Sequence, residues 1–373
     1  MKKSLIAIAA LAATGAFAQS SVTLYGRMDL GMASGKTDTT PVGGATTTTK
    51  GFELAGAENN WTGSRLGVRG SEDLGGGLKA NFNYEFRLAP DATAAGSVAG
   101  SNFGRTRMAL LQVAGDFGSV TIGTYMNPFD DIRVGAGIYG AGPVANIPGA
   151  YTLDKSPIAL NSRSTNAIGY RSPVFAGGFV ASLGTTAQNV ETSATASTKT
   201  SGYIGSVGYS NGPINALAAY GQGVNKVSTS AVILPPAPAA SNEGRVKDFG
   251  FKASYDFGVA VPYLQYENVK ATSADLLANT QTQIKSSGFE IGATFPVGAF
   301  TPYILFANNK LTPTNAAGVV GNATKISAFQ LGTKYDLSKR TFVYGGFGGS
   351  TSKVELTSEA KSTGFGLGLV HNF

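Results

Sequence analysis

The chain has 373 residues, of which 51 are glycine and none is cysteine, and its formal net charge is +7. Without cysteine, the chain cannot rely on disulfides. The positive charges are spread along the sequence, with no basic block interleaved with aromatic residues. We therefore do not expect a nucleic acid as partner.

The first residues have the pattern of a secretory signal. Two lysines precede a short apolar core over residues 5–11, and Ala16-Phe17-Ala18 is a small-x-small cleavage site. The apolar run is too short to span a membrane as a helix. We expect residues 1–18 to be removed and residues 19–373 to form one domain.

A strict two-residue alternation recurs along the rest of the chain. In residues 78–88, apolar side chains alternate with polar or charged ones such as Lys79 and Glu85. Alternate side chains of a strand point to opposite faces, so one face here is wholly apolar and the other is polar. Residues 249–257 and the final residues 365–373 repeat the pattern.

This periodicity predicts an all-β chain of sixteen strands. The predicted spans are 20–34, 63–71, 77–89, 104–115, 119–126, 164–173, 178–188, 201–211, 214–224, 246–257, 260–271, 284–296, 299–311, 325–337, 340–352 and 362–373.

The connections between these strands alternate in length. Short connections with turn residues alternate with long ones rich in Thr, Ser, Gly and Asn, such as 35–62, 127–163, 189–200 and 353–361. All long connections then lie at one end of the sheet, which is typical of a transmembrane antiparallel up-and-down barrel with short periplasmic turns and long external loops. A soluble sandwich has the same period, but the chain offers no second apolar face to bury.

The strand number bears on function. Barrels of about eight strands fill their interior with side chains, whereas barrels of about sixteen leave a water channel. Charged residues at the inward positions, such as Glu85, Lys252 and Glu267, must then face water. The sequence therefore predicts a channel for small hydrophilic solutes and ions.

Five sequence stretches together carry a family resemblance over the whole predicted mature chain. They are SVTLYG at 21–26, SRLGVRGSEDLGGGLK at 64–79, GDFGSVTIG at 115–123, IGYRSP at 168–173 and GLVHNF at 368–373. In this combination and order the chain resembles the trimeric general-diffusion porins of Gram-negative outer membranes. The resemblance is greatest to beta-proteobacterial porins such as those of Neisseria, Bordetella, Burkholderia and Comamonas.

The resemblance implies that the third long loop, from Asn127 to about Ser162, folds into the lumen and narrows it. The charges of this loop that would line the constriction are Asp130, Asp131, Arg133 and Asp154. Arginines on the facing wall would complete it. The residues that match are Arg65, Arg107 and Arg163, and alternation alone adds Arg27 and Arg87. The excess of arginine over acid gives a weak expectation of anion preference.

Arg107 conflicts with the period of its own strand. If Arg107 points inward, strict alternation also sends Leu111 and Val113 inward and Gln112 outward. A β-bulge near the start of the strand would remove the conflict, because the extra residue shifts the alternation by one.

The last residues have a further implied role. Phe373, with His371 and Leu369, resembles the C-terminal signal that the outer-membrane assembly machinery recognises. The family also implies a homotrimer surrounded by outer-membrane lipid and lipopolysaccharide.

The sequence contains no recognisable set of catalytic residues and no cofactor-binding motif. His371 is the only histidine, so a Ser-His-Asp triad or a histidine metal site lacks its components. We expect no enzyme, no cofactor and no metal. Two alternatives stay open, namely a substrate-selective channel, and a barrel that acts as an adhesin or receptor through its loops.

Overall fold

The structure is a computed structural model that describes residues 21–55, 63–88, 103–133, 160, 162–193, 196–229, 240–275 and 280–373. The predicted signal segment 1–18 and most of the third long loop lie outside these residues, so the predicted domain boundary is not tested. No helix in the described ranges is long and apolar enough to cross a membrane.

The described residues form seventeen antiparallel strands and one short helix. The elements are β1 (Ser21–Pro41), β2 (Thr47–Ala55), β3 (Arg65–Gly75), β4 (Leu78–Leu88), β5 (Phe103–Gly115), β6 (Gly118–Met126), α2 (Pro128–Arg133), β7 (Arg163–Arg171), β8 (Phe179–Ser193), β9 (Ala196–Asn211), β10 (Ile214–Thr229), β11 (Ala240–Tyr255), β12 (Val261–Asp275), β13 (Thr280–Thr294), β14 (Phe300–Thr314), β15 (Thr324–Asp336), β16 (Thr341–Val354) and β17 (Ser358–Asn372).

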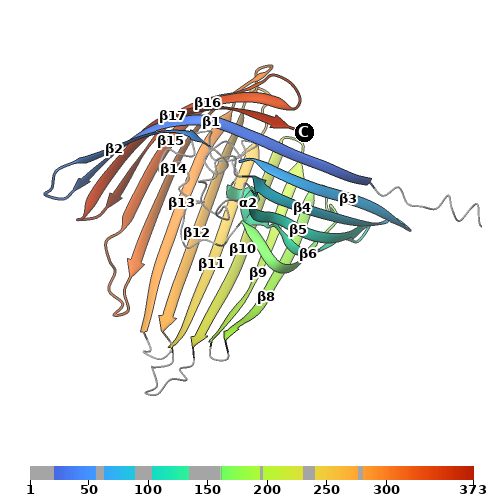
Figure 1. The fold of residues 1–373 in the computed structure, drawn as a ribbon, viewed down its shortest axis with the longest axis horizontal. Helices are drawn as coiled ribbons and strands as arrows, with labels where there is room; N and C mark the ends of the chain where they lie inside the picture. The colour runs from blue at the N-terminus through green and yellow to red at the C-terminus, as the bar shows by residue number, and fades with distance from the viewer. Residues whose placement is uncertain are drawn as a thin grey trace, which may run out of the picture.

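From β3 to β17 each strand pairs with the next, and the sheet closes where β1 pairs with β17 (Figure 1). The closing register runs from Arg27 opposite Asn372 to Pro41 opposite Ser358. On its other edge, β1 pairs first with β3 and farther along with β2. Because β2 and β3 thus share one position, the seventeen strands occupy sixteen positions around the ring, which confirms the predicted closed barrel.

The predicted loop over 35–62 is wrong in its first part, because β1 continues to Pro41 and returns as β2. The predicted loops 189–200 and 353–361 are likewise mostly paired strand, with three residues left between β16 and β17. These segments are rich in Thr and Ser and lack an apolar face. Beyond the lipid both faces of a hairpin are wet, so pairing persists without the alternation that makes a strand recognisable.

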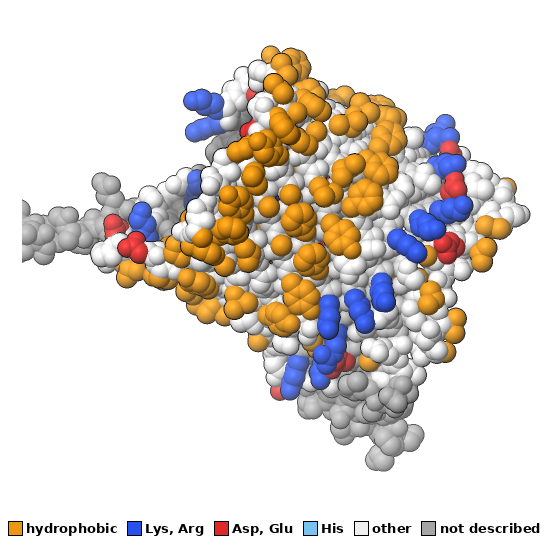
Figure 2. Space-filling view, turned by 180° about the vertical axis from the view of Figure 1, so that it is seen from behind, with side chains coloured by type: hydrophobic (Ala, Val, Ile, Leu, Met, Phe, Trp, Pro, Cys, Tyr) orange, Lys and Arg blue, Asp and Glu red, His pale blue; other side chains and the backbone are white. Residues whose placement is uncertain are grey.

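The two faces of the barrel differ as the alternation predicts. Apolar side chains at alternate positions point outward and cover a broad band of the outer surface (Figure 2). Leu367 and Leu369 on β17, and Phe373 directly after it, are each nearly half exposed on this face. Inward positions hold polar side chains such as Gln265 and Glu267, both of which are buried.

Inward tyrosines lie flat over inward glycines of neighbouring strands. The ring of Tyr344 on β16 covers Gly368 and reaches Gly31, and its hydroxyl donates to Asp29 Oδ1 at 3.0 Å. The same contact joins Tyr25 to Gly67 and Tyr263 to Gly292. Each glycine makes room for a ring whose hydroxyl reaches a polar partner, so these contacts tie adjacent strands together on the water side.

We expect Gly368→Ala to destabilise the barrel, because a Cβ there would overlap the Tyr344 ring and lie 2.8 Å from the Leu30 carbonyl oxygen. Overpacking of this kind costs about 1–3 kcal/mol. Thermal unfolding in detergent, followed by circular dichroism, measures the loss. Gly208→Ala is the matched control on the inward face, since its nearest neighbour atom would be 3.6 Å away. Equal unfolding temperatures for the two variants would contradict the packing role.

Candidate functional site

The third long loop begins with the helix α2, which lies inside the ring of strands (Figure 1). Asn127 caps the helix, since its Oδ1 accepts from the backbone N–H of Phe129 at 3.0 Å. The Asn127 N–H donates to the Ser162 carbonyl at 3.0 Å, which ties the beginning of the loop to its end. The described part of this loop is therefore lumenal, as the resemblance implied.

An apolar contact holds α2 against the inner face of β9, β10 and β11. Phe129 and Ile132 are fully buried and pack with Ala219. Ile204 and Leu217, which also point inward, pack against the same cluster. At Gly250 a Cβ would lie 2.9 Å from Ile132 Cδ1, so glycine is needed for the helix to approach the wall this closely.

A buried ionic network fixes the end of α2. The Arg133 guanidinium donates to Asp248 Oδ2 at 2.9 Å and, through Nε, to Glu267 Oε1 at 3.0 Å. Its Nη1 also donates to the Leu160 carbonyl at 2.6 Å, and the Leu160 N–H donates to Asp248. Arg133 thus anchors both ends of the loop to the wall and is almost completely removed from water.

A second group of arginines lines another part of the wall. Arg27 on β1, Arg65 on β3 and Arg87 on β4 face one another directly in register. With Arg107 on β5 they form what we call the arginine row. Arg27, Arg107 and Arg163, at the start of β7, lie close enough for their charges to act on Arg65. The structure thus brings the five predicted wall arginines into one region.

The strand conflict at Arg107 is resolved by a β-bulge. Glu85 pairs with Met108 while its neighbour Phe86 pairs with Thr106, which leaves Arg107 as the extra residue of β5. Arg107 can therefore point inward, while Leu111 is 68% exposed on the outer face. Gln112 points inward and hydrogen bonds to Asn81 and Thr121.

Glu85 lies within the arginine row. Its Oε1 accepts from Arg107 Nε at 2.6 Å and lies 3.9 Å from Arg65 Nη1. Tyr25 donates to the other carboxylate oxygen at 3.0 Å. One buried carboxylate thus partly compensates several cations and holds two of them in place.

The arginine row and α2 lie on opposite sides of the barrel. The row lies on β1–β5 and α2 packs on β9–β11, so the separation along the ring of sixteen positions runs from four steps, between β5 and β9, to eight, between β3 and β11. On α2, Asp131 is exposed and Asp130 is partly exposed. Asp154 lies outside the described residues. Cations of the wall and acids of the loop therefore face the lumen from opposite sides.

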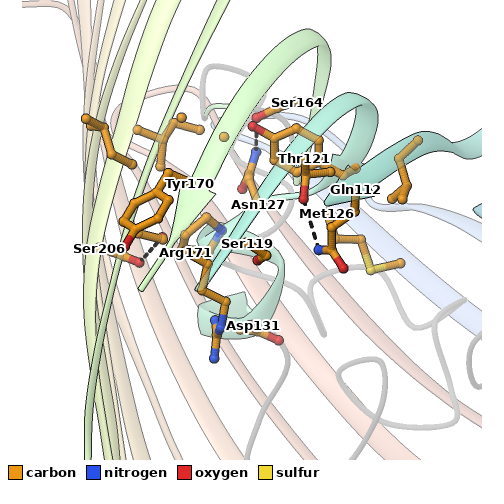
Figure 3. Close-up of a pocket in the computed structure, with 18 of the residues that line it drawn as sticks. Gln112, Ser119, Thr121, Met126, Asn127, Asp131, Ser164, Tyr170, Arg171 and Ser206 are labelled. Carbon is orange, nitrogen blue, oxygen red and sulfur yellow. Dashed lines mark hydrogen bonds between the residues drawn. The ribbon is translucent and has the colours of Figure 1, made fainter. Parts of the chain in front are cut away.

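A cavity of about 330 Å³ lies between α2 and the inner face of β5–β9 (Figure 3). Asp131 from α2 and Arg171 from β7 both extend into it, among hydroxyl and amide groups such as those of Thr121 and Gln112. Lys252 lines the adjoining cavity and donates to the Asp131 carbonyl at 2.7 Å. Polar, hydrated space thus continues beside the helix.

Sequence reasoning missed the residues that hold the loop. Glu267 appeared only as a polar inward position, Asp248 was not singled out, and Arg133 appeared as a charge lining the lumen. A signal was present in the sequence, because Ile204, Leu217 and Ala219 are apolar at inward positions of β9 and β10. Apolar side chains that face a water channel indicate that something covers them.

Comparisons with known proteins agree with the fold and the lumen. The model of the Gram-negative porin family matches residues 4–354. Outer membrane porin protein 32 of Delftia acidovorans is 35% identical over 264 residues, which cover 70% of this chain and 67% of that protein. An outer membrane porin of Bordetella pertussis is 27% identical over the full length of both chains.

Solved structures show the same architecture. The anion-selective porin from Comamonas acidovorans is 26% identical, with a TM-score of 0.64 over 95% of this chain and 100% of that chain. The trimer form of OmpT from Vibrio cholerae is 17% identical, with a TM-score of 0.61 over 95% of this chain and 99% of that one, and it shows the fold alone.

The chain belongs to the Gram-negative porin family. It is a multi-pass β-barrel of the outer membrane and forms a water-filled diffusion channel for small hydrophilic solutes and ions. Family membership indicates a channel rather than an enzyme.

We expect Arg133→Met to release α2 from the wall, because Asp248 and Glu267 would be left buried without their cation. Breaking a buried pair in this way costs about 3–5 kcal/mol. Single-channel recording in planar bilayers should show larger and noisier openings.

The triple variant R133M/D248N/E267Q removes both carboxylates as well and should recover quieter, smaller openings. Thermal unfolding of both variants checks that the barrel itself is intact. Wild-type conductance and noise in Arg133→Met would show that the ionic network does not hold the loop.

Proposed function

We propose that the diffusion channel prefers anions and that its selectivity is set between the arginine row, with Arg163, and the acids of the third long loop. The observation that carries this proposal is the direct register of Arg27, Arg65 and Arg87, continued by Arg107 on the next strand. The Comamonas acidovorans neighbour, which is described as an anion-selective porin, supports the same sign.

The proposed mechanism is a transverse electric field across the narrow water. Arginine stays charged in any plausible surroundings, so the row is a fixed positive wall. Glu85 offsets part of that charge, and Asp131 on α2 supplies the opposite sign across the lumen. Screening extends over about 8 Å at physiological salt, so passing ions feel a lining at that distance. Clusters of charged side chains then bias which ions pass.

A general channel is favoured over a substrate-selective one. A track for a specific solute would need lumenal aromatic rings that are free to stack on it. Tyr25, Tyr125 and Tyr263 instead lie against glycines of neighbouring strands, as parts of the wall. The adhesin or receptor alternative depends on external loops that the described residues cover only in part.

The proposal includes no catalytic step. The ring of His371 shares a hydrogen bond of 2.8 Å with Thr341, and the side chain is exposed near the end of the terminal strand, where His371 pairs with Met28, the neighbour of Arg27. Within the described ranges no group of three or more His, Cys, Asp or Glu could hold a metal ion.

We also propose a homotrimer embedded among outer-membrane lipid and lipopolysaccharide. The Vibrio cholerae neighbour is described in a trimer form, and its likeness supports the fold on which such an assembly is built. The broad apolar band of the outer surface offers each barrel a face for a neighbouring copy as well as for lipid.

The C-terminal residues are proposed to act as an assembly signal. Leu369, His371 and Phe373 lie at alternate positions of the terminal strand, and Phe373 exchanges two backbone hydrogen bonds with Gly26 of β1, at 3.0 and 3.1 Å. The Phe373 ring covers Gly26 on the outer face. The same side chain would thus be exposed for recognition before closure and packed on β1 after it.

Replacing Arg65, Arg107 and Arg163 together with Ser should lower the anion preference. At about 8 Å in water each charge contributes about 0.5 kcal/mol, so three give a change of about tenfold in the anion-to-cation permeability ratio. Glu85→Gln should move the ratio the other way, by about twofold. Reversal potentials in asymmetric salt measure both shifts. Unchanged potentials in the triple variant would exclude these arginines from selectivity.

Phe373→Ala should slow barrel assembly in cells more than folding in vitro, because it removes a recognised group but leaves the closing register in place. The measurement compares the amount of heat-modifiable barrel in outer membranes with the yield of refolding into detergent micelles. Leu367→Ala, which removes a similar outward side chain from the same strand, is the control. An equal loss in both settings would assign Phe373 a purely structural role.

A further inference from the structure

Two side chains of opposite charge reach into the cavity beside α2 without pairing with each other (Figure 3). Arg171 is the last residue of β7, and Asp131 lies on α2. Among the described residues, the Arg171 guanidinium has no ion-pair or hydrogen-bond partner, and the Asp131 carboxylate has no ion pair. The hydrogen bond from Lys252 goes to the backbone carbonyl of Asp131 and not to its carboxylate. A cation and an anion thus border the same hydrated space.

Apolar side chains line another side of this cavity. Met108 and Leu110 on β5 are half-buried and line it together with Leu217 on β10. Met108 pairs with the inward Glu85, and Leu110 lies two residues from the inward Gln112, so both β5 side chains point into the lumen. Leu217 packs against the apolar cluster that holds α2, whereas Met108 and Leu110 do not belong to that cluster. The cavity therefore offers apolar surface that the helix does not cover.

The cavity lies on the short-turn side of α2. Arg171 ends β7, and Ser119 and Leu217 lie near the beginnings of β6 and β10, at strand ends that short turns connect. The helix itself packs farther along the strands, against Ala219 and Gly250. A solute that crosses the lumen past α2 therefore meets this cavity next to the helix.

We propose that the cavity binds zwitterionic solutes with an apolar side chain, of the chemical class of the α-amino acids. The planar fork of the Arg171 guanidinium fits a carboxylate, and the Asp131 carboxylate accepts from an ammonium group. Met108 and Leu110 then contact the apolar side chain. An apolar lining with a few convergent polar groups is typical of small-molecule sites.

The size and the charge of the site support this class. A volume of about 330 Å³ is at the lower end of the range for small-molecule pockets, so it suits a single small solute better than an oligosaccharide. A solute without net charge gains little from a wall of one sign, but a pair of opposite charges can hold and orient it. The proposal rests on the diffusion function of the barrel and is independent of the proposed ion preference.

The first test needs no variant and uses three compounds with the same branched apolar chain. Leucine carries both charges, isocaproate lacks the ammonium group, and isoamylamine lacks the carboxylate. Each is titrated against the detergent-solubilised wild-type protein by saturation-transfer NMR. Leucine should bind with a dissociation constant on the order of 1 mM. The other two should bind about tenfold more weakly, since each lacks one charge-assisted contact.

Variants assign each charge to its residue. Arg171→Gln should weaken leucine binding about tenfold and leave isoamylamine binding unchanged. Asp131→Asn should also weaken leucine binding and leave isocaproate binding unchanged. Arg69→Gln is the matched control, because Arg69 is an exposed arginine of β3 that stacks on Tyr25 and does not line the cavity. This variant should bind leucine like the wild type.

Equal wild-type affinity for the three compounds would overturn the proposal, as would unchanged leucine binding in Arg171→Gln. An equal loss of leucine binding in Arg69→Gln and Arg171→Gln would also overturn it, because the effect would then be one of overall charge. The titration uses neither a membrane nor a salt gradient, so its failure is distinct from a failure of the proposed ion preference.

Discussion

The structure depends on one constraint, namely that no backbone N–H or C=O group can be left unpaired in hydrocarbon. A sheet with free edges cannot meet that requirement, so the pairing of β1 with β17 is what makes the fold possible. The closure continues through the last residue, where Phe373 exchanges hydrogen bonds with Gly26. Once the ring is closed, the side-chain period of two assigns every strand residue either to lipid or to water.

Closure of the ring creates the lumen. Inside it, side chains pack through apolar contacts with α2 and through buried ion pairs, whereas the outer face packs against lipid. Inside, α2 covers the few apolar inward side chains of β9 and β10, and Arg133 neutralises two buried carboxylates at the edge of that contact. The wall of β1–β5 carries the arginine row, whose side chains are half-buried or buried, with Glu85 as a partial counter-charge. On the outer surface, exposed lysines of β11–β16 likewise lie where the apolar band ends. Charge is thus placed at each boundary between water, lipid and protein.

Much of this could be predicted from sequence because lipid imposes a period. The strand positions and the ring of sixteen followed from alternation and connection length, whereas the upper parts of β1 and β2 did not, since above the lipid no apolar face is required. The disagreement at Arg107 correctly indicated an irregularity, and the structure places a bulge there. The role of Arg133 could not be predicted, because it depends on Asp248 and Glu267, more than a hundred residues away.

The central claim is that the fixed charges facing the narrow lumen favour anions. The most direct measurement is the reversal potential of the wild-type channel in a planar bilayer with a potassium chloride gradient at neutral pH. An anion-selective sign that weakens as the salt concentration rises is expected, because exposed charges are screened by salt. A zero or cation-selective potential would contradict the proposed action of the arginine row.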